Sequence, residues 1–454
     1  MESASSATAA AGPSQPTDVS DASSSEAGAA SSSVPIAENP PPAALGRYET
    51  EEANEASMVD DLHVTQSIEL GPEDVPDHLS DESSLPDDSS SVASEAMDDA
   101  LPEPEPPAED HSVQQLTTHT EPVFAVAVNA THPEIFATGG GDDVAYLWRV
   151  GQPTPVIKLE GHTDTVSSLA FSSDGTLLAT AGLDGQVRVW EAATGRLVVA
   201  LEGATQGINW ICWHARGAVL LAGSEDATAW MWKLPEGTVM QIFSAHSASV
   251  AYGGFVNSGR SVLTGSEDGT VRVWNPRTGT VDHCLHTTST HHEPRPVTAL
   301  AGHPSQPVFL YGTDEGGLKL AHSETGKLVA ALPGHEASIE SVGFCDALPY
   351  AASAGMDGKL CVWDLGTLAQ RQMCLHMAGV VELRWLKDSP MILSCTVSRE
   401  LRLWDGRSGD CLQTLTGHHE AVLCLDIGYT SQGIYVVSGS DDRTARLWQP
   451  RIGS

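Results

Sequence analysis

The stretch VLTGSEDGTVRVW (residues 262–274) decides the fold of this chain. It contains an apolar run, a turn that carries Asp268, and a second apolar run that ends at Trp274, six residues after the aspartate. Two further copies are worn, with Ser398 six residues before Trp404 and Glu315 six before Ala321. The intact spacing recurs in Asp142 and Trp148, Asp184 and Trp190, Asp226 and Trp232, Asp357 and Trp363, and Asp442 and Trp448. The chain therefore repeats one unit eight times.

A second marker, usually a histidine, opens each unit 22 to 24 residues before the acidic position. Successive markers are 41 to 46 residues apart, which is the period expected when each unit is a sheet of four short strands. The markers are His119, His162, Ala204, His246, His292, His335, His376 and His418.

Each unit contains four short runs of strand character, separated by turns rich in Gly, Asp, Asn and Ser. After Trp448 only QPRIGS remains, which is too short for the last strand of the eighth unit. The segment HSVQQLTTH (111–119) overlays VIKLEGH (156–162), with Leu116 on Leu159, so we expect it to complete the last sheet and close a ring. The predicted fold class is all-β, an eight-bladed propeller over residues 111–450. Seven blades with one divergent unit is the alternative.

Charge divides the chain into two parts. Residues 1–110 contain 26 acidic residues against the single base Arg47, a net charge of −25, whereas the remainder carries −12 of the total of −37. The first part is rich in Ser, Ala and Pro and lacks apolar periodicity, so we expect a disordered acidic tail. Such charge repels nucleic acid and anionic membranes and attracts basic proteins.

No apolar run is long enough to cross a membrane, and the N-terminus has the character of neither a signal nor a transit peptide. We therefore expect a cytoplasmic protein, with a partly nuclear location as the alternative. The eight cysteines form no Cys-x-x-Cys pair and mostly lie in apolar runs, which favours a role as small core residues. A closed ring needs no second chain to fold, so we expect a monomer.

These features resemble the WD-repeat propellers, and the resemblance covers residues 111–450. In that family the marker histidine, a hydroxyl of the second strand, the turn aspartate and the tryptophan form a hydrogen-bonded chain inside each blade. The resemblance implies that five units have the complete set. They are His119, Thr138, Asp142 and Trp148; His162, Thr180, Asp184 and Trp190; His246, Thr264, Asp268 and Trp274; His335, Ser353, Asp357 and Trp363; and His418, Ser438, Asp442 and Trp448.

The incomplete third, fifth and seventh units are expected to be less rigid. Repetition of the His, Asp and Ser or Thr sets at the blade period argues against a catalytic triad, which would be needed only once. The glycine runs lack a following Lys and Ser or Thr, and His291-His292 and His418-His419 lack further ligands. We therefore predict no enzyme activity, cofactor or metal site.

Within the superfamily, the third unit INWICWHARGAVLLAGSEDATAWMWKLPEG (208–237) resembles that of the angio-associated migratory cell protein family. One fungal member of that family is a dedicated chaperone of a basic large-subunit ribosomal protein. The resemblance implies that this chain escorts such a protein to the assembling 60S particle. The animal namesake is linked instead to cell migration.

Acidic residues on the connecting turns agree with a basic protein partner, because clustered carboxylates attract segments rich in Lys and Arg. The extra tryptophans of the third unit could anchor the partner, although core packing is the simpler interpretation for each. The predicted partner-binding residues are Asp143, Asp164, Glu225, Glu267, Glu293, Asp314, Glu315, Glu336 and Asp441, together with Trp210 and Trp230.

Two rival functions stay open from the sequence. The run Trp404-Asp405-Gly406-Arg407 partly resembles the box with which some WD-repeat proteins dock the adaptor of a cullin ubiquitin ligase, although Ser398 stands where that box has an acid. A general signalling scaffold is the other alternative, since propellers bind many kinds of partner.

Overall fold

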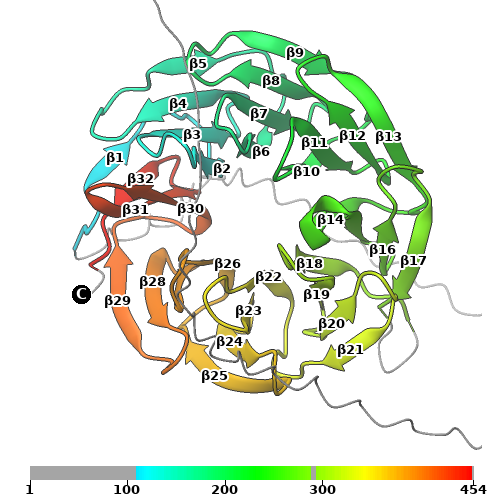
Figure 1. The fold of residues 1–454 in the computed structure, drawn as a ribbon. Helices are drawn as coiled ribbons and strands as arrows, with labels where there is room; N and C mark the ends of the chain where they lie inside the picture. Colours follow the sequence, from blue (N-terminus) through cyan, green and yellow to red (C-terminus); the bar gives the residue numbers. More distant parts are fainter. Residues whose placement is uncertain (1–108, 288–292, 452–454) are drawn as a thin grey trace, which may run out of the picture. The chain divides into compact units, whose positions relative to one another are not determined.

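The computed structural model describes residues 109–287 and 293–451, so the predicted tail up to residue 108 and the marker His292 lie outside the described residues. Within them, eight four-stranded antiparallel sheets stand around a common axis (Figure 1). This confirms the eight-bladed all-β propeller. The seven-bladed alternative is wrong, because the divergent fifth unit also forms a complete blade. The only helical turn in the described part of the chain is η1 (Asn257–Gly259).

The first four blades follow the chain order, each running from the innermost strand to the rim (Figure 1). Blade 1 consists of β2 (Val123–Val128), β3 (Ile135–Gly140), β4 (Ala145–Arg149) and β5 (Ile157–Leu159). Blade 2 consists of β6 (Val166–Phe171), β7 (Leu177–Gly182), β8 (Val187–Glu191) and β9 (Leu197–Leu201). Blade 3 consists of β10 (Ile208–Trp213), β11 (Val219–Ser224), β12 (Thr228–Lys233) and β13 (Thr238–Ser244). Blade 4 consists of β14 (Val250–Val256), β15 (Ser261–Ser266), β16 (Thr270–Trp274) and β17 (Val281–His286).

The last four blades repeat this arrangement. Blade 5 consists of β18 (Val297–Gly302), β19 (Val308–Thr313), β20 (Leu318–His322) and β21 (Leu328–Ala331). Blade 6 consists of β22 (Ile339–Phe344), β23 (Tyr350–Gly355), β24 (Lys359–Asp364) and β25 (Ala369–Leu375). Blade 7 consists of β26 (Val380–Trp385), β27 (Met391–Thr396), β28 (Glu400–Asp405) and β29 (Cys411–Thr416). Blade 8 consists of β30 (Val422–Thr430), β31 (Gly433–Ser440), β32 (Ala445–Trp448) and β1 (Gln114–Leu116).

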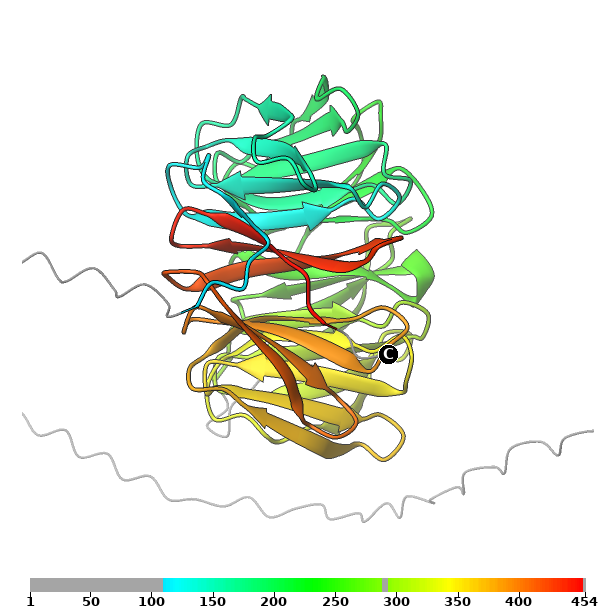
Figure 2. The same cartoon turned by 90° about the vertical axis from the view of Figure 1, so that its left-hand side faces the viewer.

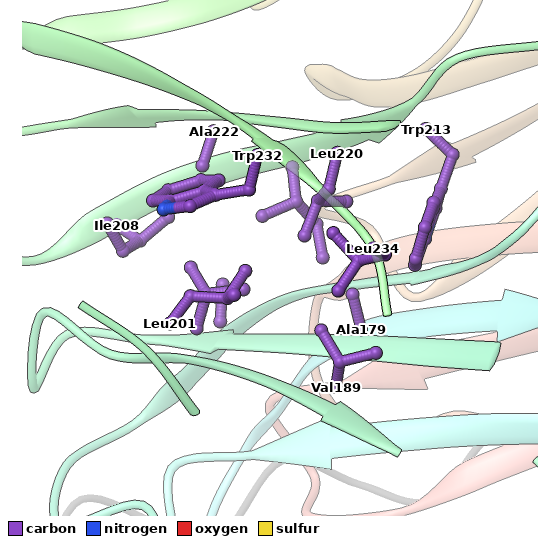
Figure 3. Close-up of a cluster of buried hydrophobic side chains, with 12 residues drawn as sticks. Ala179, Val189, Leu201, Ile208, Trp213, Leu220, Ala222, Trp232 and Leu234 are labelled. Atoms are coloured by element: carbon purple, nitrogen blue, oxygen red, sulfur yellow. The ribbon is translucent and has the colours of Figure 1, made fainter. Parts of the chain in front are cut away.

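The hydrophobic core lies between neighbouring sheets, because each sheet is covered on both faces. The second strand of each blade is therefore almost wholly apolar or small, and all six residues of β15 are buried. Figure 3 shows the cluster between blades 2 and 3, where Leu201 and Val189 of blade 2 face Leu220 and Trp232 of blade 3. Burial of such side chains contributes about 1.5–3 kcal/mol each, so the repeated contacts between blades hold the ring together.

The ring closes through the first strand of the described chain. β1 pairs antiparallel with β32, so the cyan start and the red end of the described chain meet at the side of the ring shown in Figure 2. Gln114 lies opposite Leu447, and Leu116 lies opposite Ala445. The Leu116 side chain is buried, and Arg446 Nη1 lies 2.6 Å from the Asp110 carboxylate. The predicted closure by the segment before His119 is therefore confirmed.

The antiparallel order gives the ring two distinct faces. The turns between second and third strands and the connections between blades emerge together, and we call this the upper face. The turns between first and second strands, and those between third and fourth strands, form the lower face.

Candidate protein-binding face

Four side chains form a hydrogen-bonded chain inside blade 4. His246 Nδ1 lies 2.9 Å from the Asp268 carboxylate, and Nε2 lies 2.7 Å from the Thr264 hydroxyl. The Trp274 indole N–H donates to the same hydroxyl over 2.7 Å. All three hydrogen bonds can form together when Nδ1–H donates to the carboxylate, the hydroxyl donates to Nε2, and the indole donates to the hydroxyl.

The other four predicted sets have the same contacts, with all the corresponding distances between 2.7 and 3.2 Å. The residues that carry their hydroxyls are completely buried, and their histidines are buried to nine-tenths or more. A completely buried hydroxyl has no surface that a substrate could reach. The sets are thus built to stabilise blades.

The turn aspartate also holds the backbone of the upper face. Asp268 accepts from the N–H groups of Ser247 and Thr270 and from the Thr270 hydroxyl. Burial works to raise its pKa, but these hydrogen bonds and His246 outweigh burial and hold the pKa of Asp268 below its ordinary value.

Blade 3 replaces the missing imidazole by an aromatic ring. Its marker position is Ala204, and the Trp230 ring packs against neighbouring Gly203, where an added Cβ would lie 2.7 Å from the ring. Trp230 stacks on Trp232 at 6.1 Å, and the Trp232 indole donates to the Glu202 carbonyl over 3.2 Å. The Trp230 ring therefore takes the place of the missing imidazole in the packing of blade 3.

Blade 7 keeps every member except the carboxylate. His376 Nε2 lies 2.9 Å from the Ser394 hydroxyl, which also accepts from Trp404, but Nδ1 is buried without a partner. Ser398 stands at the aspartate position and contacts Thr396 instead. Burial, assisted by the positive charge of Arg402, lowers the pKa of His376 to about 4.

Replacing Ser398 by aspartate is expected to stabilise the protein by about 1–2 kcal/mol, because a carboxylate there can accept from His376 Nδ1 and from the Met377 N–H. The pKa of His376 should rise, since the new charge favours imidazolium. Urea unfolding at pH 7 and an NMR titration of His376 measure the two effects. Ser398→Ala is the control. Equal stabilities of the two variants would contradict this account.

Five of the predicted acids stand on the upper face without an ion pair in the described structure: Asp143, Asp164, Glu225, Glu267 and Asp441. Burial and the neighbouring carboxylates of Asp164 and Asp142 raise the pKa of Asp143, and burial and Asp442 raise that of Asp441. Asp143 and Asp441 therefore each have another carboxylate nearby on this face.

The other four predicted acids are already paired within the chain. Arg295, in the connection before β18, lies 2.5 Å from Glu315, 3.8 Å from Glu293 and 3.9 Å from Asp314. Lys359 Nζ lies 2.8 Å from Glu336. Their negative charge is partly neutralised, whereas Glu225 on blade 3 and Glu267 on blade 4 have no ion pair in the described structure.

The two extra tryptophans are half-buried and have occupied indole groups. Trp210 donates to the Val250 carbonyl over 3.0 Å and packs between blades 3 and 4, and Trp230 donates to the Thr228 hydroxyl over 2.8 Å. Both side chains contribute to blade packing in the described structure, so neither stands free as an anchor.

Apolar side chains on the same face were missed by the sequence reasoning. Leu183, Met356 and Val397 occupy the position just before the turn aspartate, where blades 3 and 4 have Glu225 and Glu267. They are 38–45% exposed, and Met377 beside them is 89% exposed. Overlaying that single column of the repeat would have found them. The upper face thus combines acids on blades 3 and 4 with an apolar area on blades 6 and 7.

Other chemistry finds little support in the described residues. No group of three or more His, Cys, Asp or Glu among them is arranged to hold a metal ion. No helix among the described residues is long and apolar enough to span a bilayer. The Arg407 guanidinium of the proposed cullin-docking box is turned onto Asp405, 2.9 Å away.

Six segments match the family of the WD domain, G-beta repeat: residues 110–149, 153–191, 195–233, 237–275, 326–364 and 409–449. The stretches between these segments contain the first three strands of blades 5 and 7, the two worn units. The chain therefore belongs to the WD-repeat proteins, and none of these matches is to a catalytic family.

Among curated relatives, an uncharacterised WD repeat-containing protein of Schizosaccharomyces pombe is 38% identical over 341 residues, covering 73% of this chain and 85% of that protein. The human angio-associated migratory cell protein is 32% identical over 181 residues, covering 37% of this chain and 41% of its own length.

Two solved structures share the fold. Saccharomyces cerevisiae Sqt1 has a TM-score of 0.70 and 21% identity, covering 76% of this chain and all of that one. Chaetomium thermophilum Sqt1, bound to the N-terminus of the ribosomal protein L10, has a TM-score of 0.69 and 22% identity, covering 75% of this chain and all of that one.

Proposed function

We propose that this chain is a non-enzymatic binding protein that holds a basic segment of a newly made large-subunit ribosomal protein on its upper face. It would keep that segment from aggregating or pairing wrongly before 60S assembly. The observation that carries the proposal is the pair Glu225 and Glu267, two exposed and unpaired carboxylates on adjacent blades. We place the activity in the cytoplasm, where such proteins are synthesised, and a partly nuclear role is an extension of it.

Charge explains why the partner should be basic. Asp164 and Asp441 extend the negative potential around the face, and Asp143 lies close enough to Asp164 for the two carboxylates to repel. Arginine or lysine side chains would relieve that repulsion and gain charge-assisted hydrogen bonds.

The apolar area on blades 6 and 7 indicates that the bound segment also contains apolar side chains. Met356, Val397 and Met377 lie across the same face and would accept apolar side chains of the bound segment. Methionine adapts to differently shaped partners. A basic segment with interspersed apolar residues fits this face better than a uniformly charged one. The Sqt1 structure, whose ligand is a ribosomal protein terminus, supports the choice of partner class.

The decisive experiment reverses charge on the two free carboxylates. The full chain and its Glu225→Lys/Glu267→Lys variant would be used to capture proteins from translating cells, followed by mass spectrometry. We expect one basic large-subunit ribosomal protein to be enriched by the native chain. Its purified N-terminal segment should bind the variant at least tenfold more weakly, since each carboxylate contributes on the order of 1 kcal/mol.

Asp282→Lys is the matched control, because Asp282 is exposed on the rim strand β17 and makes no ion pair in the described structure. Binding that weakens with salt in the native chain, as screening requires, and survives Asp282→Lys supports the proposal. No enriched ribosomal protein, or capture unaffected by the double reversal, would overturn it. Capture of a cullin adaptor instead would favour the ubiquitin-ligase alternative.

A further inference from the structure

Three arginines surround a cleft of about 670 Å³ on the lower face of blades 3 to 5. Arg216 belongs to the turn between β10 and β11, Arg260 to the turn between β14 and β15, and Arg277 to the turn between β16 and β17. All three are exposed, and none of their guanidinium groups forms an ion pair or hydrogen bond in the described structure. The same rim has His214 and Ser305.

This concentration of positive charge is unusual in so acidic a chain. Of the nearby exposed bases on the lower face, Arg196 pairs with Glu191 and Lys233 with Glu236, whereas Lys327 of blade 5 has no ion pair in the described structure. Three unpaired guanidinium groups around one cleft repel each other. An anion between them would relieve that repulsion and accept several charge-assisted hydrogen bonds.

The cleft is also shaped by an unusual turn. Asn257, Ser258 and Gly259 have φ angles of 53°, 57° and 81°, and only glycine adopts this conformation without strain. His214 packs against Gly259, where an added Cβ would lie 1.9 Å from Nε2, and edge-on against Phe255 at 4.9 Å. The one acid engaged by the turn, Glu324, accepts from the Asn257 amide over 2.8 Å. These contacts fix the imidazole at the cleft.

We propose that this cleft binds a phosphorylated serine or threonine of a peptide segment. A phosphomonoester presents about two negative charges and three acceptor oxygens at one point, which suits arginines converging on one cleft. RNA would need a longer track of cations for successive phosphates and aromatic surfaces for its bases. Ion pairs neutralise Arg196 on blade 2 and Lys233 on blade 3. Lys327 of blade 5 is a further unpaired base in the described structure, but no continuous track of cations leads from the cleft across blades 2 and 3. The site lies opposite the acidic area and is independent of the proposed function.

The test uses the full chain and immobilised peptides with a central phosphoserine between randomised neighbours, compared with the same peptides containing serine. We expect binding only to the phosphorylated set, and competition by inorganic phosphate. Arg216→Gln, Arg260→Gln and Arg277→Gln should each weaken binding by about tenfold. These side chains are exposed, so thermal unfolding should be unchanged.

Arg149→Gln is the control, since Arg149 is also exposed and has no ion pair in the described structure but lies on blade 1. Equal binding of phosphorylated and unphosphorylated peptides would overturn the proposal, as would an equal loss in the control. Tighter binding of a short single-stranded RNA through the same arginines would overturn it in favour of a nucleic-acid site.

Discussion

Replacing Asp268 by alanine should lower the free energy of unfolding by roughly 3–5 kcal/mol, because hydrogen bonds to a charged group contribute about 1.5–3 kcal/mol each and several are lost together. The variant would leave His246 Nδ1, two backbone N–H groups and the Thr270 hydroxyl without their acceptor. Since the pKa of Asp268 is lowered in the folded state, this stabilisation is present above the unfolded pKa and is lost as pH falls toward the folded pKa. Urea unfolding at pH 7 and at pH 3 measures both effects.

Glu267→Ala provides a sharp control for that variant. The two residues are neighbours in the sequence and have the same charge, but Glu267 is exposed and has no partner in the described structure. Its removal should change the stability by less than about 0.5 kcal/mol while weakening the binding of a basic partner. A comparable loss of stability in both variants would contradict the inference that the repeated acids stabilise the blades and the non-repeated acids bind the partner.

Replacing Leu116 by alanine should cost about 3 kcal/mol, the middle of the range for a buried leucine. Its side chain is 1% exposed and packs with Phe136, Trp148 and Leu447 at the junction of blades 1 and 8. The loss falls on the strand that closes the ring, so residues before His119 should become open to proteolysis before the rest of the ring unfolds. Urea unfolding and timed digestion followed by mass spectrometry measure the two results.

Val113→Ala separates closure from general damage to this segment. Val113 is 58% exposed and lies one residue before β1, so the variant should digest like the native chain. Early cleavage in both variants would mean that the segment is loosely held whatever fills the core. Early cleavage in neither would mean that the ring opens elsewhere first.

The fold was predictable because the residues that define it repeat. The six-residue spacing between Asp268 and Trp274 recurs between the corresponding residues of every intact unit. Overlaying the units also placed Leu116 in the closing strand. Repetition carries this information because every blade must satisfy the same buried polar groups and fill the same space between sheets. The hydrogen-bonded sets seen in the structure have the members that the resemblance to the WD-repeat propellers implied.

The binding face was only partly predictable, because its residues differ from blade to blade. Sequence spacing placed Glu267 and Glu315 on the same face, but only the structure shows that Arg295 pairs with Glu315 and leaves Glu267 free. Met356 was overlooked although its column could be read from the overlay. The arginine cleft joins turns from three blades, and no spacing rule links Arg216 to Arg277.

The closing pair has a consequence for tension applied to the molecule. β1 and β32 run antiparallel, so the two ends of the chain leave the ring at the same end of the pair, where Gln114 opposes Leu447. A pull between the two ends would break the three residue pairs one after another, as a zipper opens, instead of loading them all at once. The ring can therefore open under a small force applied along this one seam. An attachment through one end alone leaves the seam unloaded.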